Sequence, residues 1–254
     1  TKGNTDYKVT ISKPSVRDSS MNFASDYEFS FSTQSYNEFD STAFMIANTP
    51  VNINATEATK KLYTFLKDNF GKKMISAAMA NPSLNTQMAD TIYAKTGKYP
   101  AINCFDFVHH IYSSPLNPSN WIDYTNTSVE ENWWKNGGIV AFMWHWNVPI
   151  NKYYIKNFDK YTFRVNSTEA NTSFDAAEAT VDGTWEKQIV DRDLEIVANY
   201  LLALQNKGIP VIWRPLHEGS GNIYNYADGK PWFWWGNRGS SNEEHAEAYK
   251  KLWV

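Results

Sequence analysis

The stretch that decides the fold runs from Gly208 to Glu218 and reads GIPVIWRPLHE. Its apolar part, Ile209 to Trp213, is typical of a strand buried within a parallel sheet. The polarity then changes abruptly, because Arg214, His217 and Glu218 follow directly. In α/β barrels the functional side chains stand at the carboxyl ends of the strands. This stretch therefore predicts a buried strand that delivers ionisable groups to a site.

The same arrangement of apolar run, polar loop and helical stretch occurs repeatedly along the chain. Besides 209–213, the apolar runs lie at 73–79, 100–105 and 138–144, and helical stretches follow at 86–95, 129–135, 185–207 and 242–254. Residues 56–70 form a further amphipathic helical segment, with Thr56 as N-cap and Gly71 as its end. Strands alternating with helices predict an α/β fold with a parallel sheet.

Two α/β architectures compete, an open doubly wound sheet and a closed (β/α)8 TIM barrel. No glycine-rich phosphate loop follows the first strand of the chain, which disfavours a doubly wound nucleotide-binding domain. We therefore predict a TIM barrel, of which about four βα units are present, and a barrel needs eight. Four units cannot close the sheet, so we expect the sequence to be part of a longer polypeptide.

Residues 1–50 differ from the rest, since Ser, Thr, Asn and Asp dominate them. Tyr27–Ser32 and Tyr7–Ile11 alternate apolar and polar residues, which predicts half-buried strands. We predict a β-rich N-terminal extension over 1–50 and the first part of the barrel over 51–254.

Composition excludes several classes of partner. The formal net charge is −3, and Lys and Arg do not cluster, so no nucleic acid is expected as a partner. No apolar run approaches the roughly 20 residues of a membrane-spanning helix. Cys104 is the single cysteine, which precludes an internal disulfide. Aromatic residues make up 16% of the chain, and they serve either as core or as platforms for sugar rings.

Glu218 is the candidate catalytic group. A glycosidic oxygen leaves poorly unless it is protonated as its bond breaks. A carboxyl near an apolar wall has a raised pKa and stays protonated near neutrality, as this role requires. His217 is placed to bind a sugar or a second carboxylate, and Arg214 to orient the carboxylates. The alternative interpretation is an ion pair that caps the strand end.

Further candidates for sugar contact follow the other strands. His145 lies between Trp144 and Trp146 just before a loop, and strand alternation predicts that it faces away from both. His145 is expected to face the sugar, and Trp146 to contact the sugar as a stacking ring. Asp106 ends the 100–105 run and is given a substrate-contact or structural role. Within the aromatic run at 232–236, Trp232 is the first choice to line a cleft.

Other chemistries fit the sequence less well. His109 and His110 are adjacent, which makes them a poor chelate, because metal-binding histidines need paired spacing such as His-x-x-x-His. The chain has no Gly-x-Ser-x-Gly elbow, and Cys104 lies in mid-strand. We therefore predict no metal, and no cofactor is expected, since two carboxylates suffice for glycosidic hydrolysis.

Three motifs together resemble glycoside hydrolase family 26, and the resemblance extends from about residue 55 to the end. They are Arg214–Glu218, Trp144–Asn147 and Trp232–Gly236, and the segment Gly97–Ala101 also fits. The resemblance implies a (β/α)8 barrel and a retaining β-mannanase, with an acid/base Glu after strand 4 and a nucleophile Glu after strand 7. Glu218 matches the acid/base, and His217, His145 and Trp232 match sugar-contacting positions.

The sequence departs from the family pattern at two places. The loop at 219–230 is longer than usual, and no seventh strand is present, so no nucleophile is named. Retention needs two carboxylates about 5–5.5 Å apart. Asp106 is not taken as the second carboxylate, because it ends strand 2, which is separated from strand 4 by strand 3.

The leading hypothesis is an endo-β-1,4-mannanase that acts on mannan, galactomannan or glucomannan. The alternatives are a β-glucanase or xylanase of the same family, or a non-catalytic mannan-binding protein if the polypeptide ends at residue 254. The expected partner is a β-mannan polysaccharide or oligosaccharide, and the expected state is a monomer. Because such a polymer cannot enter a cell, we expect an extracellular, periplasmic or cell-surface location.

Overall fold

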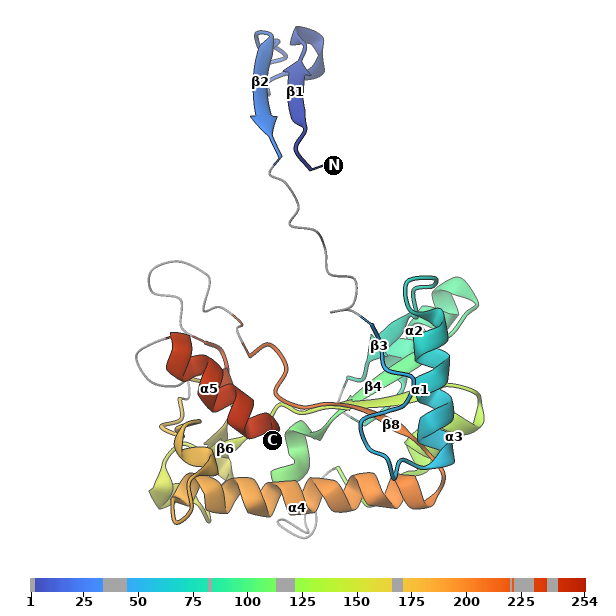
Figure 1. The fold of residues 1–254 in the computed structure, drawn as a ribbon, viewed down its shortest axis with the longest axis vertical. Coiled ribbons are helices and arrows are strands. Elements are labelled where there is room, and N and C mark those ends of the chain that lie inside the picture. Colours follow the sequence, from blue (N-terminus) through green and yellow to red (C-terminus); the bar gives the residue numbers. More distant parts are fainter. Residues whose placement is uncertain are drawn as a thin grey trace. The chain divides into compact units, whose positions relative to one another are not determined.

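The structure is a computed structural model, and it describes residues 3–33, 45–81, 84–112, 122–165, 171–219, 221, 231–236 and 242–254. The chain divides into two compact units, Thr1–Asn48 and Thr49–Val254. Figure 1 shows the helices and strands of both units.

The first unit is built around a two-stranded antiparallel sheet. Its strands are β1 (Asp6–Ile11) and β2 (Tyr27–Ser32), and the short 3-10 helix η1 (Lys13–Ser15) follows β1. The two strands confirm the predicted period-two segments, but the predicted half-burial of Tyr27–Ser32 is wrong, because every residue of β2 is exposed. Alternation puts the aromatic residues on one face, and a two-stranded sheet has no second layer of its own to cover them.

A parallel sheet forms the centre of the second unit. Its strands lie in the order β3 (Ala77–Met79), β4 (Ile102–Asp106), β5 (Ile139–Met143) and β8 (Val211–Arg214). All three pairings are parallel, which confirms the predicted parallel α/β sheet. Over the described residues this sheet is open rather than closed. A small antiparallel pair, β6 (Val148–Pro149) with β7 (Tyr161–Thr162), lies outside it.

The helices begin and end close to the predicted limits. They are α1 (Glu57–Asn69), α2 (Gln87–Thr96), α3 (Ser128–Lys135), α4 (Trp185–Asn206) and α5 (Asn242–Trp253). The hydroxyl of Thr56 accepts a hydrogen bond from the Thr59 N–H, which caps α1 as predicted. Gly97 and Gly208 follow α2 and α4 with φ of 70° and 73°, the left-handed conformation that ends a helix.

Short 3-10 helices connect several of these elements. They are η3 (Phe107–Tyr112), η4 (Lys152–Tyr154), η5 (Phe158–Lys160), η6 (Glu178–Thr180) and η7 (Trp234–Gly236). Helices α2, α3 and α4 contact β3, β5 and β8, and Figure 1 shows the long helix α4 lying alongside the sheet. Helix α5 contacts η7, so it packs against the tryptophan-rich segment.

The central strand β5 and the edge strand β8 differ in burial. Phe105 and Val140 are fully buried, and Phe142 is nearly so, on the face that the helices cover. On β8, by contrast, Val211 and Ile212 are half-buried and Arg214 is exposed. The predicted burial of the strand at 209–213 is confirmed at Ile209, which is buried, and is wrong at 211–213, because β8 is the edge strand of the described sheet.

Candidate active site

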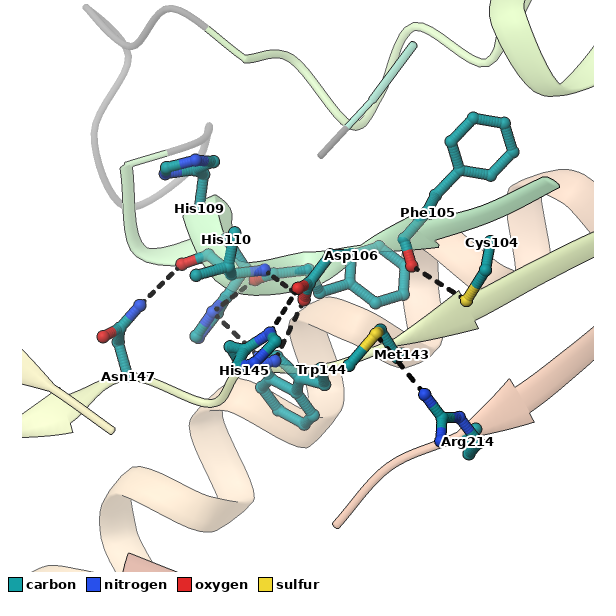
Figure 2. Close-up of polar contacts among 12 residues, drawn as sticks. Cys104, Phe105, Asp106, His109, His110, Met143, Trp144, His145, Asn147 and Arg214 are labelled. Atoms are coloured by element: carbon teal, nitrogen blue, oxygen red, sulfur yellow. Dashed lines mark hydrogen bonds and ion pairs between the residues drawn. The ribbon is translucent and has the colours of Figure 1, made fainter. Parts of the chain in front are cut away.

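The register of the sheet brings polar side chains from three strands to one edge. Asp106 pairs with Met143, and Met143 pairs with Arg214, so these residues form one row across β4, β5 and β8. Partners in register point to the same face of a sheet. His145 lies two residues beyond Met143 and faces the same way, as the strand alternation predicts. The carboxyl edge of the sheet therefore carries the candidate site (Figure 2).

Asp106 holds His145 through two hydrogen bonds. Its Oδ1 accepts the backbone N–H of His145 at 2.9 Å, and its Oδ2 lies 2.5 Å from the Nδ1 of that ring. The same Oδ1 also accepts the backbone N–H of Val108 at 3.0 Å. The hydroxyl of Tyr124 donates to the backbone carbonyl of Asp106. Asp106 is thus buried, fixed in place and aimed at His145 (Figure 2).

His145 and His217 meet at the centre of this edge. Their ring centroids lie 4.5 Å apart at an interplanar angle of 76°. Phe163 and Phe233 flank the His145 ring at 5.0 and 5.7 Å. Since the His145 side chain is 28% exposed, its ring is packed at the sides and open to solvent in part.

His217 is buried, and this determines its charge. The pKa of His217 is lowered to about 4, chiefly by burial and then by the neighbouring His145 and Arg214, while Asp106 opposes them. His217 is therefore neutral at neutral pH. Its Nδ1 has no hydrogen-bond partner among the described residues, and its backbone carbonyl accepts the indole N–H of Trp235 at 2.8 Å. The ring thus brings an unpaired polar atom to the site.

Glu218 lies in a strained turn directly after His217. Glu218 and Leu216 both have positive φ, 52° and 49°, which is uncommon for residues other than glycine. The Glu218 carbonyl accepts the N–H of Gly221 at 2.8 Å, and the Leu216 carbonyl accepts the Tyr249 hydroxyl. A Cβ at Gly219 would lie 2.4 Å from the Tyr249 ring, so only glycine fits there. Helix α5 therefore holds this turn.

The Glu218 side chain is exposed, which differs from the apolar wall expected around it. Arg214 is also exposed, and its Nη2 lies 3.6 Å from the Met143 sulfur. Within the described part of the chain no carboxylate pairs with Arg214, so its role in orienting carboxylates stays a prediction. Arg214 ends β8 and Glu218 follows it, and β8 is the edge strand of the described sheet.

Trp146 does not contact the cleft, and its predicted sugar contact is corrected. Its ring stacks on Trp144 at 3.9 Å on the helix side of the sheet, and it is buried. Its indole N–H donates to the carboxylate of Asp193 on α4 at 2.9 Å. A tryptophan beside a sugar-facing histidine resembles a platform in sequence, but strand alternation turns it to the core.

A buried polar network behind the sheet was not predicted from the sequence. The Trp144 indole donates to Nδ1 of His110, and Nε2 of His110 lies 3.2 Å from Asp193 Oδ2. Arg192 pairs with the other oxygen of Asp193. His110 is thus part of the core. The sequence feature that could have indicated this network is Asp193, an acidic residue on the buried side of the predicted helix at 185–207.

Trp232 is the exposed member of its aromatic run, 42% exposed, whereas Phe233, Trp234 and Trp235 are buried. A Cβ at Gly221 would lie 2.9 Å from the Trp232 ring and 3.0 Å from the Glu218 carbonyl, so Trp232 lies beside the Glu218 turn. Its sugar contact stays a prediction. The long loop at 219–230 falls outside the described residues except at 219 and 221.

Neither metal nor thiol chemistry is indicated in the described chain. No group of three or more His, Cys, Asp or Glu that could hold a metal ion occurs among the described residues. Burial raises the pKa of Cys104 to about 11, so its thiol stays protonated and is a poor nucleophile. Among the described helices, none is both long and apolar enough to cross a membrane.

The second unit is similar in sequence to known proteins. The model of glycosyl hydrolase family 26 matches residues 51–254. Mannan endo-1,4-beta-mannosidase A of Piromyces sp is 34% identical over 211 residues, which are 81% of this chain and 30% of that protein. The mannan endo-1,4-beta-mannosidase of Bacillus subtilis strain 168 is 29% identical and matches 80% of this chain and 53% of its own.

Solved structures agree with these matches. The GH26 domain of an endo-beta-mannanase/endo-beta-glucanase from Prevotella bryantii has a TM-score of 0.70 at 38% identity over 82% of this chain and 60% of its own. A beta-mannanase from a symbiotic protist of the termite Reticulitermes speratus, complexed with gluco-manno-oligosaccharide, has a TM-score of 0.63 at 33% identity over 82% of this chain and 58% of its own. The chain thus spans less than two thirds of each of these relatives.

Proposed function

This chain is a member of glycosyl hydrolase family 26, and we propose that it forms the first part of the catalytic domain of a retaining endo-β-1,4-mannanase. The observation that carries the proposal is the strained turn at Leu216–Glu218, which presents an exposed carboxylate directly after the buried His217. Strained backbone of this kind costs roughly 1–3 kcal/mol and concentrates at active sites.

In the proposed mechanism Glu218 protonates the oxygen of the scissile glycosidic bond as that bond breaks. It then accepts a proton from the water that hydrolyses the glycosyl-enzyme intermediate. The second carboxylate, which forms that intermediate, comes from a later strand of a (β/α)8 barrel whose first four strands are β3, β4, β5 and β8. Closing such a barrel would also cover β8 and give Glu218 the apolar surroundings that a general acid needs.

The remaining groups at the sheet edge bind the sugar. His145 and His217 offer ring nitrogens to hydroxyl groups, and the exposed ring of Trp232 offers a flat apolar surface to a sugar face. Mannan is supported as substrate by the relatives, which are themselves named mannan endo-1,4-beta-mannosidases. A polymeric substrate of this size supports a location outside the cytoplasm, either extracellular, periplasmic or at the cell surface.

Replacement of Glu218 tests the proposal in the full-length protein. We expect Glu218→Gln to lower the release of reducing ends from galactomannan at least a hundredfold, since general acid catalysis contributes about 10²–10⁴-fold. An aryl mannoside whose leaving group needs no proton should keep a rapid first burst of phenol, because only the later base-assisted step then depends on Glu218.

Glu243→Gln, at an exposed position in the first turn of α5, is the matched control and should leave activity unchanged. Hydrolysis of galactomannan by Glu218→Gln at the parent rate would contradict the assignment. A panel of galactomannan, glucomannan, mixed-linkage glucan and xylan separates the mannanase from the glucanase and xylanase alternatives. Tight binding of mannan without turnover in the parent protein would favour the binding protein.

A further inference from the structure

Asp106 occupies an unusual position for a residue at the edge of a substrate site. It is buried, so its carboxylate does not face an incoming sugar directly. Both of its carboxylate oxygens are engaged by groups of the protein. Oδ1 accepts two backbone N–H groups, from Val108 and His145, and only Oδ2 is left to meet a side chain, the imidazole of His145.

This arrangement determines which nitrogen of His145 carries a proton. A carboxylate only accepts hydrogen bonds, so the Nδ1 that faces Oδ2 must be the N–H nitrogen. In the neutral ring the other nitrogen, Nε2, then keeps its lone pair. Figure 2 shows His145 joined to Asp106, and the His145 side chain is 28% exposed, so Nε2 is the nitrogen left for a ligand.

We propose that Asp106 is a positioning residue that fixes the tautomer and the orientation of His145, so that Nε2 accepts a hydrogen bond from a substrate hydroxyl. This inference rests on the proposed function and deepens it. The anchoring is rigid, because the Asp106 carbonyl is held by Tyr124 and its Oδ1 by two backbone groups. Asp106 therefore acts through His145 and does not touch the substrate.

The substitution Asp106→Asn separates the backbone anchoring by Asp106 from its control of the His145 tautomer. The amide oxygen still accepts the N–H groups of Val108 and His145, so the backbone anchoring survives. The amide NH₂ then faces Nδ1, and two donors cannot face one another, so the proton of the ring must move to Nε2. The nitrogen that faced the substrate as an acceptor becomes a donor. Asp123→Asn is the matched control, since Asp123 also accepts a backbone N–H, from Thr125, but lies on an exposed loop.

Nitrogen-15 NMR of histidine-labelled full-length protein reads the tautomer directly. We expect the Nδ1 of His145 to be the protonated nitrogen in the parent and in Asp123→Asn, and the two nitrogen signals to exchange character in Asp106→Asn. A merely structural role would lower the melting temperature without this exchange. An unchanged tautomer in Asp106→Asn would overturn the proposal.

A double-mutant cycle on galactomannan hydrolysis tests the route of action. We expect Asp106→Asn to lower kcat/KM roughly tenfold or more in the parent and less than about twofold when His145→Gln is already present, because interacting residues are not additive. An equal loss in both backgrounds would mean that Asp106 acts on the substrate itself and would overturn the positioning role. If Glu218→Gln keeps full turnover, the proposed function fails, while the NMR result still decides the role of Asp106.

Discussion

Single residues show where burial and ionisation conflict, and Glu130 is the clearest case outside the site. It lies in the first turn of α3, is 1% exposed, and its Oε2 has no hydrogen-bond partner among the described residues. The pKa of Glu130 is raised to about 7, chiefly by burial and to a smaller extent by Glu131, while a backbone hydrogen bond and Lys207 oppose the rise. The folded protein therefore keeps a proton on Glu130 that the unfolded chain loses earlier.

The stability of the protein should thus fall as the pH rises through the window between the two pKa values. The unfolded Glu130 loses its proton near pH 4.5 and the folded one near pH 7, so the loss accumulates between these values and is complete above pH 7. Its total is roughly 3 kcal/mol at most. Urea unfolding from pH 4.5 to 8 should show that Glu130→Gln removes this slope.

Glu195→Gln, on the exposed side of α4, serves as the control and should keep the parent slope. If Glu130→Gln and the parent lose stability in parallel as the pH rises, the buried carboxyl is ionised in the folded protein and the prediction is wrong.

The residue scale also shows what the sequence could and could not predict. The alternation around His145 correctly predicted that this ring and its tryptophan neighbours face opposite sides of the strand. It did not prevent the wrong expectation for Trp146, because a core tryptophan and a sugar-binding tryptophan have the same neighbours in the chain. Only the buried partner on α4, Asp193, distinguishes them, and this contact spans 47 positions of sequence.

At the scale of the elements, the Asp193 network joins α4 to the segment after β5. Burial alone would raise the pKa of Asp193, yet His110 and Arg192, with the Trp146 indole, hold it below its usual range. Asp193 is therefore a buried anion with three partners from three different segments. We infer that this network orients the segment 144–146, whose opposite side presents His145.

Removing the anion should destabilise the fold more than removing one of its partners. We expect Asp193→Ala to cost roughly 3–5 kcal/mol, because it leaves Arg192 and His110 without their charged partner. Trp146→Phe keeps the stack on Trp144 and loses one hydrogen bond to a charged group, which costs roughly 1.5–3 kcal/mol. Chemical denaturation at pH 7 measures both.

Asp191→Ala provides the control on the same helix, since Asp191 pairs with Lys187 at the surface. Such exposed pairs contribute about 0–1 kcal/mol. A loss in Asp193→Ala as small as that in Asp191→Ala would mean that the network does not hold the segment 144–146.

At the scale of the whole molecule, hydrophobic periodicity and glycine stops were sufficient to place the four strands of the parallel sheet and the five α-helices, but not the small pair β6 and β7 or the 3-10 helices. Burial was predicted less well, because it depends on neighbours that the local pattern does not contain. The two wrong predictions of burial, for β2 and for β8, share this origin. The strand β2 and the edge strand β8 have patterns typical of buried strands, yet neither is covered on both faces within the described chain.

The open edge of β8 therefore provides a test of the proposed barrel. A polypeptide restricted to residues 49–254 presents the unpaired backbone groups of β8 and the half-buried Ile212, and exposed sheet edges of this kind promote association. We expect this fragment to elute as concentration-dependent oligomers in size-exclusion chromatography with light scattering, whereas the full-length barrel stays monomeric. Ile212→Lys in the fragment should reduce the oligomers, because a charge on an edge strand opposes pairing. A fragment that stays monomeric at high concentration would show that β8 needs no further strand, and would count against the closed barrel.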